Sequence, residues 1–504
     1  HGDVIHSRPL PVNYGGDIGV RVFYGANDGT FRSVDADTGV ERWSFVAPEF
    51  FGRLARLKDN SPLISYPNLN PSVSPTPEPK SYFFDGSAGL FQTADSAKVW
   101  VYAGMRRGGR RIYAFDVTHP DAPVYKWRAG CPNLDNDDGC SADMSGVGQT
   151  WSTPNVALIK GYSTSTPVVV IGGGYDSCED ADTTSPACGG RKGGFVYILD
   201  GFTGAVVRKF ETDRAVAADV AMVDVDNDGS PDYAYAVDTG GSIYRIDFIN
   251  NPEQRATLAS AGWTKRKVAA TSGGYRKFLF APALLASGSK VYVALGSGDR
   301  EHPLQSQYPY DRNVTNRFYV YKDDLAAPAD TAAYNLDAME DYTNQDSCST
   351  PQVLPNSSLK GWFMDLRAYG RGEQVVTSAL IASGMVTFST NRPIPPSTAT
   401  CSTSLGEARG YWVNLLNGAG AINVQGTCGG DRSSPFVGGG LPPSPVMASS
   451  VPIGDKAVSV IIGAVQKGGE GAEASTSSSS IGPQKHRPVI SSKRKRVYRY
   501  TSGS

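Results

Sequence analysis

Short apolar runs separated by Gly-rich turns recur along the whole chain. Each copy has one apolar strand, a turn, and a second apolar strand that ends near Asp and is often followed by Thr-Gly. The paired runs fall at 22–29 and 31–39, 99–104 and 111–116, 168–174 and 195–204, 232–237 and 242–247, 291–296 and 317–321, 385–389 and 410–415, and 458–463 and 496–500. Repeated units of four short strands are typical of a propeller. The pattern therefore predicts an all-β, seven-bladed β-propeller.

Two features suggest how the blades meet at the axis. Small apolar segments with Pro precede several copies, at 151–154, 280–282 and 443–446, and are predicted to be the innermost strands. The last copy has no obvious fourth strand. We expect residues 3–12 to supply it, because ring closure removes edges that would otherwise aggregate.

The spacing between copies is irregular, and the extra residues are predicted to form loop insertions. These fall at 53–80, 130–150, 175–193, 298–316 and 323–360. Residues 468–490 are of low complexity and are expected to be a disordered loop. Residues 1–504 are thus interpreted as a single propeller domain with insertions.

Composition agrees with this interpretation. The 504 residues include 57 Gly, 33 Pro and 25 Tyr, and only 19% are charged, which favours strands and turns. A net charge of −1 argues against nucleic acid as the main partner. The sequence has no run of 18 apolar residues, so no membrane span is expected. It begins at His1 and not at Met, so it is expected to be a fragment or a processed form.

Cysteine spacing indicates an oxidising compartment. The seven cysteines are Cys131, Cys140, Cys178, Cys188, Cys348, Cys401 and Cys428. The first four form two close pairs in polar loops, with spacings of nine and ten, and are predicted to be loop-stapling disulfides. A bridge between Cys401 and Cys428 is the preferred third pair, but Cys348 could equally pair with either of them.

Residues 224–232 read Asp-Val-Asp-Asn-Asp-Gly-Ser-Pro-Asp and carry the strongest chemical signal. Acids on alternate positions can converge on one cation if the backbone wraps round it, and Gly229 at position 6 permits the sharp turn. Oxygen ligands of this kind suit Ca²⁺. The predicted ligands are the side chains of Asp224, Asp226, Asp228 and Asp232, and the carbonyl of Ser230.

The flanks of this loop distinguish it from an EF-hand. Position 12 is Tyr235, not Glu, and β-like runs lie on both sides, so the loop is predicted to join two strands of a hairpin. An Asp/Gly-rich surface turn is the alternative, but four like charges in nine residues would repel one another without a cation. Residues 135–139 also carry acids, but without the third alternate acid, so a solvated turn is favoured there.

Common catalytic motifs are absent from the sequence. The five histidines are scattered, and the chain has no Gly-x-Ser-x-Gly, no P-loop and no His-Glu-x-x-His. The sequence therefore does not predict a hydrolase, a P-loop nucleotide enzyme or a zinc protease.

The repeats resemble those of quinoprotein alcohol dehydrogenase-like propellers. Residues 361–366, 388–393 and 224–232 together resemble the C-terminal domain of the PilY/PilC-type type IV pilus biogenesis proteins and tip adhesins. The resemblance implies a modified propeller, located at the cell surface or pilus, whose calcium loop controls pilus extension against retraction. The implied partners are pilins, minor pilins or assembly machinery. The resemblance also implies that the chain is the C-terminal part of a longer secreted protein, and that adhesion to host or abiotic surfaces belongs to an N-terminal region outside this sequence.

Two other functions are considered. Quinone-dependent dehydrogenases typically have an adjacent Cys–Cys pair and an axial calcium with a catalytic Asp. Here no two cysteines are adjacent, and the acids come from one hairpin. The enzyme is therefore the alternative, and a non-enzymatic role is predicted. A further interpretation is that calcium only stabilises the hairpin. This structural role is compatible with the regulatory one.

Overall fold

The computed structural model describes residues 2–65, 72–181, 192–250, 255–273, 275–394, 406–424, 426–436, 439–453, 456–463 and 484–485. These residues form seven β-sheets, numbered here in chain order. Neighbouring strands within each sheet are antiparallel, except at two added edge strands. The seven sheets confirm the predicted propeller.

The first three sheets have four strands each. Sheet 1 consists of β1 (Leu10–Gly15), β2 (Gly19–Gly25), β3 (Thr30–Asp35) and β4 (Glu41–Val46). Sheet 2 consists of β5 (Ala88–Gln92), β6 (Val99–Gly104), β7 (Arg110–Asp116) and β8 (Val124–Cys131). Sheet 3 consists of β9 (Asn155–Ala157), β10 (Val168–Gly172), β11 (Phe195–Asp200) and β12 (Val206–Glu211).

The next three sheets have five strands each. Sheet 4 consists of β13 (Ala221–Val223), β14 (Tyr233–Val237), β15 (Ser242–Asp247), β16 (Thr264–Ala270) and β20 (Tyr334–Asn335). Sheet 5 consists of β17 (Ala283–Ser287), β18 (Lys290–Gly296), β19 (Arg317–Asp324), β22 (Gly361–Asp365) and β21 (Glu340–Asp341). Sheet 6 consists of β23 (Gln374–Val375), β24 (Leu380–Ala382), β25 (Met385–Arg392), β26 (Glu407–Asn414) and β27 (Ser433–Pro435).

Sheet 7 consists of β28 (Val446–Ile453), β29 (Lys456–Ile462) and β30 (Gln484–Lys485). The described helices are short: α1 (Phe51–Asp59) and the 3₁₀ turns η1 (Pro48–Phe50), η2 (Ser177–Asp180), η3 (Ser260–Gly262) and η4 (Leu336–Ala338). None of them is long and apolar enough to cross a lipid bilayer.

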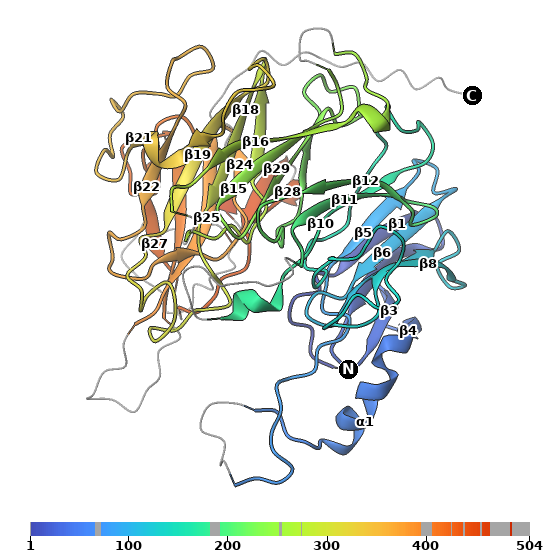
Figure 1. Ribbon diagram of the computed structural model, residues 1–504. Helices are drawn as coiled ribbons and strands as arrows, with labels where there is room; N and C mark the ends of the chain where they lie inside the picture. The colour runs from blue at the N-terminus through green and yellow to red at the C-terminus, as the bar shows by residue number, and fades with distance from the viewer. Residues whose placement is uncertain are drawn as a thin grey trace.

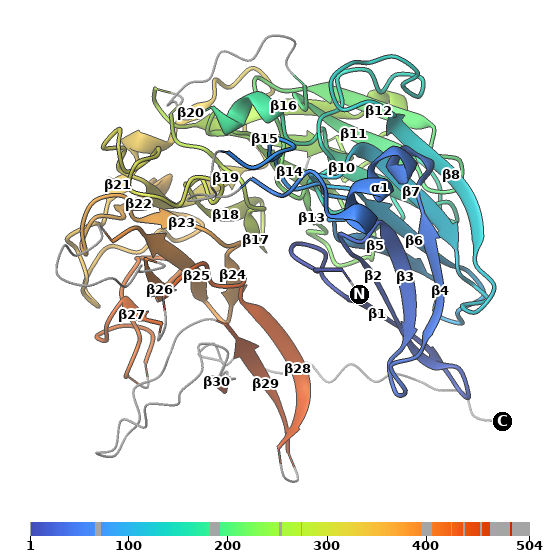
Figure 2. The ribbon, with the colours of Figure 1, turned by 90° about the horizontal axis from the view of Figure 1, so that it is seen from below.

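The sheets follow one another in chain order around a common centre (Figure 2). Strands from the start of each sheet lie on the inner side (Figure 2), where β5 contacts β9, β13 contacts β17, and β17 contacts β24. The small Pro-containing segments lead directly into the inner strands β9, β17 and β28. The prediction that these segments are themselves the innermost strands is therefore wrong for 151–154 and 280–282, and of 443–446 only Val446 lies in a strand; the strands begin directly after the Pro-containing segments.

Apolar layers between adjacent sheets form the core. Val168 and Val170 of β10 pack toward sheet 4 with Ala234 and Ile246, whereas Val169 packs toward sheet 2. Successive side chains of a strand point to opposite faces, so a strand covered on both faces needs apolar residues at every position. This explains why the repeat reads as continuous apolar runs and not as an alternating pattern.

Two expectations about the ends of the ring have different outcomes. The expectation that residues 3–12 complete the last sheet is wrong, because Leu10–Gly15 pairs with β2 in sheet 1, where Leu10 lies opposite Phe23. The predicted strand at 496–500 lies outside the described residues, and the short β30 pairs with β29 instead. Most of 468–490 also lies outside them.

The insertions contain elements that the sequence pattern did not predict. The segment after β4 forms η1 and α1, which lie near sheet 1 at one end of the molecule (Figure 1). The excursion 323–360 contributes β20 and β21, which add parallel edge strands to sheets 4 and 5. Two-residue strands are too short to leave a periodic signal.

The disulfides are partly as predicted. Cys131 is bonded to Cys140, and Cys178 is disulfide-bonded, but its predicted partner Cys188 lies outside the described residues. The preferred bridge between Cys401 and Cys428 is wrong, because Cys428 is bonded to Cys348. The loop after β26 lies against the loop after β21, where Arg432 donates a hydrogen bond to the Thr343 carbonyl oxygen, and this packing brings the two cysteines together.

Candidate metal centre

The loop 224–232 joins β13 to β14, as predicted for a hairpin. Ala221 lies opposite Tyr235 and Val223 opposite Tyr233, and the Asp232 amide donates to the Val223 carbonyl at 2.9 Å. Tyr235, at position 12, is fully buried, and its hydroxyl donates to Asp323 in the neighbouring sheet. The loop is thus a short excursion from the end of two ladder-paired strands.

The Asp224 carboxylate holds the loop in a tight turn. Its Oδ1 accepts from the Asn227 amide at 2.7 Å, and its Oδ2 accepts from the Gly229 amide at 2.7 Å. Asn227 has φ 60° and Gly229 has φ 91°, both in the left-handed region, which Asn tolerates and Gly adopts at little cost. The sequence signal of a Gly at position 6 therefore has a direct conformational cause.

Three of the predicted ligands converge. Single carboxylate oxygens of Asp224, Asp226 and Asp232 all lie within 4.8 Å of one another. Asp232 is buried, and burial together with the charges of Asp226, Asp224 and Asp228 raises its pKa, although a hydrogen bond from the Val225 amide opposes the rise. Three carboxylates at this separation fit a hard cation such as Ca²⁺, which takes oxygen ligands in a flexible shell.

The other two predicted ligands have different contacts. Asp228 forms a close ion pair with Lys160 of the β9–β10 connection in sheet 3, which lowers the pKa of the Asp228 carboxyl and raises that of Lys160. The hydroxyl of Ser230 accepts a hydrogen bond from the Lys160 amide at 3.1 Å. Asp228 is therefore outside the converging trio and faces the neighbouring sheet.

A second cation approaches from the β15–β16 connection. The guanidinium of Arg255 lies 3.3 Å from Oδ2 of Asp226. Arg255, Lys160 and three of the loop acids line a small cavity of about 40 Å³. Sequence reasoning missed both cations, because Lys160 is 68 residues from Asp228 and neither residue belongs to a motif.

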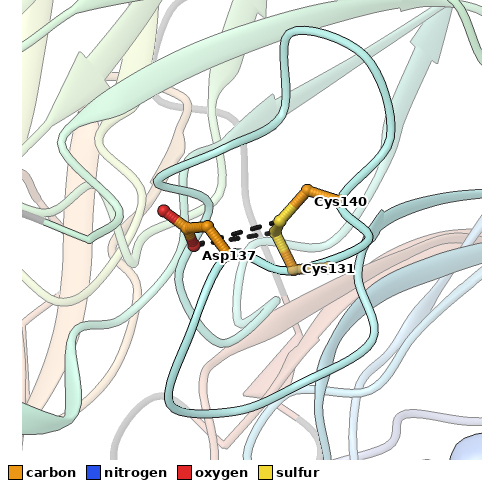
Figure 3. Close-up of side chains that lie close together, drawn as sticks. All are labelled: Cys131, Asp137 and Cys140. Carbon is orange, nitrogen blue, oxygen red and sulfur yellow. Dashed lines mark hydrogen bonds between the residues drawn. A yellow bond between two sulfur atoms is a disulfide. The ribbon is translucent and has the colours of Figure 1, made fainter.

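A second group of possible metal ligands is structural. Asp137 lies beside Cys131 and Cys140, with its Oδ1 3.9 Å from each sulfur (Figure 3). The two sulfurs are bonded to each other, so neither is available as a thiolate ligand. Asp137 instead forms an ion pair with the buried Arg110 and accepts from the Gly146 amide, and residues 135–139 are exposed, which favours the interpretation of this segment as a solvated turn.

A buried charged network ties sheet 3 to sheet 5. The ammonium of Lys277 lies 2.8 Å from Oδ2 of Asp299 and 3.3 Å from Oε2 of Glu179. Nδ1 of His302 lies 2.8 Å from the same Asp299 oxygen, and its Nε2 lies 3.2 Å from the Asp180 carbonyl oxygen. These charges pair with one another between the two sheets, so we interpret the network as a structural contact that holds sheets 3 and 5 together.

Comparison with known proteins gives consistent results. Residues 17–278 match the model of the PilY1 β-propeller domain family. The type IV pilus biogenesis factor PilY1 of Pseudomonas aeruginosa is 25% identical over 406 residues, which cover 73% of this chain and 31% of that protein. A PilY1 homologue of Xylella fastidiosa is 25% identical over 455 residues, covering 85% and 32%.

The chain thus spans about a third of the length of these relatives. Among solved structures, the C-terminal domain of P. aeruginosa PilY1 superimposes with a TM-score of 0.59 at 18% identity, covering 88% of this chain and 90% of that one. At this identity the likeness concerns the fold.

Proposed function

The chain belongs to the PilY1 β-propeller family, and from this premise we propose that it is a calcium-binding regulatory and interaction domain of a type IV pilus biogenesis factor. In this role it controls pilus extension against retraction, and with it twitching motility and surface attachment. The observation that carries the calcium part is the convergence of Asp224, Asp226 and Asp232.

The donor set supports a hard cation. Asp224, Asp226 and Asp232 supply the converging carboxylates, and Asp228 and the Ser230 carbonyl are the further ligands proposed from the loop sequence. A bound Ca²⁺ would neutralise the repulsion among these acids. The chain's own contribution is to preform the turn, through the Asp224 hydrogen bonds and the left-handed conformation of Gly229.

The position of the loop suggests how a partner could detect whether the loop is ordered. The Asp232 carbonyl oxygen accepts a hydrogen bond from the amide of Phe248, directly after β15, and Ser230 and Asp228 contact Lys160 in the β9–β10 connection of sheet 3. Ordering the loop therefore changes a surface shared by sheets 3 and 4. A partner that reads this surface responds to a local order–disorder change and not to refolding.

The wider setting follows from the family. We propose that residues 1–504 form one propeller domain of a longer, secreted protein at the cell surface or pilus. Its partners are pilins, minor pilins or assembly machinery. The relatives are named pilus biogenesis factors, which favours a non-enzymatic role. No observation favours the alternative, a quinone-dependent dehydrogenase.

Calorimetric titration of the chelator-treated protein with Ca²⁺ tests the proposal. The wild type should bind one ion, and the double variant Asp224→Ala/Asp232→Ala should lose that binding while keeping the circular dichroism of the wild type. Asp311→Ala, at an exposed acid outside the loop, is the control and should bind normally. No binding by the wild type would remove the calcium role, and binding without any effect of the loop variants on pilus extension would remove the regulatory role.

A further inference from the structure

Lys160 holds the acidic loop through both its backbone and its side chain. Its amide donates to the Ser230 hydroxyl at 3.1 Å, and its ammonium pairs with Oδ2 of Asp228. Lys160 belongs to the connection between β9 and β10, so both contacts cross from sheet 3 to sheet 4. The backbone contact fixes the residue, and the side chain then reaches into the cavity that Asp226 and Asp232 also line.

Asp228 therefore has two potential cationic partners. The loop sequence assigns it as a ligand at position 5, whereas its carboxylate here pairs with an ammonium. One carboxylate near a divalent ion and an ammonium cannot stabilise both fully, because the two cations repel each other at short range. The side chain of Lys160 is 50% exposed and that of Asp228 is 33% exposed, so their ion pair is solvated and easily exchanged.

We propose that Lys160 competes with the divalent cation for the Asp228 carboxylate. Ion binding then breaks the Lys160–Asp228 ion pair, which is a side-chain contact between sheets 3 and 4. This inference rests on the proposed function, since it concerns the same site. It assigns to Lys160 two effects: it lowers the affinity of the loop for calcium, and it makes the sheet 3–sheet 4 contact depend on calcium.

The charge of Lys160 is the property that matters. Lys160→Gln removes the ammonium and leaves the backbone contact with Ser230, so the calcium dissociation constant should fall by about two- to fivefold, the range expected for loss of one exposed ion pair. Lys160→Arg keeps the charge and should bind like the wild type. Lys267→Gln is the matched control, because Lys267 forms a similarly exposed pair with Asp213, away from the loop acids.

Calorimetric titration of these three variants and the wild type with CaCl₂ is the first experiment. Tighter binding by Lys160→Gln alone supports the inference. Unchanged or weaker binding by Lys160→Gln, or an equal gain in Lys267→Gln, overturns it and leaves calcium binding intact. Absence of binding in the wild type overturns the proposed calcium function itself, so the two failures are distinguishable.

Amine acetylation followed by mass spectrometry gives a second readout on the wild-type protein. Calcium should increase the acetylation rate of Lys160, whose ammonium loses its carboxylate partner, and should leave that of Lys267 unchanged. If calcium binds by calorimetry but the reactivity of Lys160 does not change, the exchange at Asp228 is overturned.

Discussion

At the scale of single residues, Asp232 is the most buried of the three converging acids, and its negative charge is repelled by those of its neighbours. Asp232→Asn keeps an oxygen that can accept from the Val225 amide but removes one negative charge. We expect the variant to unfold at a higher urea concentration than the wild type in chelator. Its calcium affinity should fall roughly tenfold or more, as for other losses in a metal site.

The opposite signs of these two effects make the prediction specific. A purely structural role for Asp232 would lower both stability and affinity. Urea titrations in chelator and in excess calcium, read by tryptophan fluorescence, separate the two cases. The same decrease of stability in both conditions would contradict a site organised around charge repulsion.

Gly229 is required for its backbone conformation and not for space. Its φ is +91°, and a Cβ added there would meet no atom within 4 Å. Gly229→Ala should therefore destabilise the ordered loop by about 1–2 kcal/mol through backbone strain alone. The calcium affinity should fall correspondingly, by about tenfold. Gly52→Ala in α1, where a Cβ also meets open space, should leave the affinity unchanged; an equal loss there would contradict the conformational argument.

At the scale of elements, the disulfides close loops of very different length. The Cys348–Cys428 bond joins residues 80 apart and ties the segment before β22 to the loop after β26, whereas Cys131–Cys140 spans nine residues. The loop-entropy relation gives about 4.5 kcal/mol for the long loop and about 2.6 kcal/mol for the short one. Paired Cys→Ser variants at the long bridge should therefore lose more stability than those at the short bridge.

Urea unfolding of the two paired variants, each with the remaining disulfides intact, measures this difference. We expect a gap of about 2 kcal/mol in the free energy of unfolding, with the long-bridge variant less stable. Equal losses, or a larger loss at Cys131–Cys140, would show that local strain or residual structure in the unfolded chain outweighs loop length.

The elements differ in how well the sequence predicts them. Strands such as β10 and β14 are covered on both faces, so every position is apolar and the run is visible in the sequence. The loop 224–232 is also visible in the sequence, because acids on alternate positions with Gly229 among them are typical of a cation-binding turn. β20 and β21 could not be predicted, since their pairing with β16 and β22 depends on where a long excursion returns.

At the scale of the whole molecule, contacts between sheets were the least predictable feature. Lys160 pairs with Asp228 across 68 residues, and the Lys277 ammonium approaches Glu179, 98 residues away. Periodicity reports on the strand in which it occurs and contains no information about which charged side chains meet across a ring. The same limitation explains why the sequence cannot decide which two of Cys348, Cys401 and Cys428 pair, although the structure joins Cys348 to Cys428.

The buried network between sheets 3 and 5 should make the stability of the ring depend on pH. Burial lowers the pKa of His302, but the hydrogen bond and charge of Asp299 outweigh it, so the pKa is raised above 6.5. Burial raises the pKa of Asp299, but His302 and Lys277 outweigh it, so that pKa lies below 3.8. The His302 contribution is complete below pH 6.5 and is lost as pH rises through the folded pKa. The Asp299 contribution is present above pH 3.8 and is lost as pH falls below it.

His302→Gln should therefore lower the free energy of unfolding by about 1.5–3 kcal/mol at pH 6, the range for one hydrogen bond to a charged group, and by less at pH 8.5. The decline in wild-type stability between these two pH values should flatten in the variant, because a neutral amide has no proton to lose. His119→Gln, at a histidine in the connection between β7 and β8, should keep the wild-type slope. If His302→Gln kept that slope as well, the pH dependence would have to arise outside this network, and the tie between sheets 3 and 5 would rest on the Lys277 ion pairs.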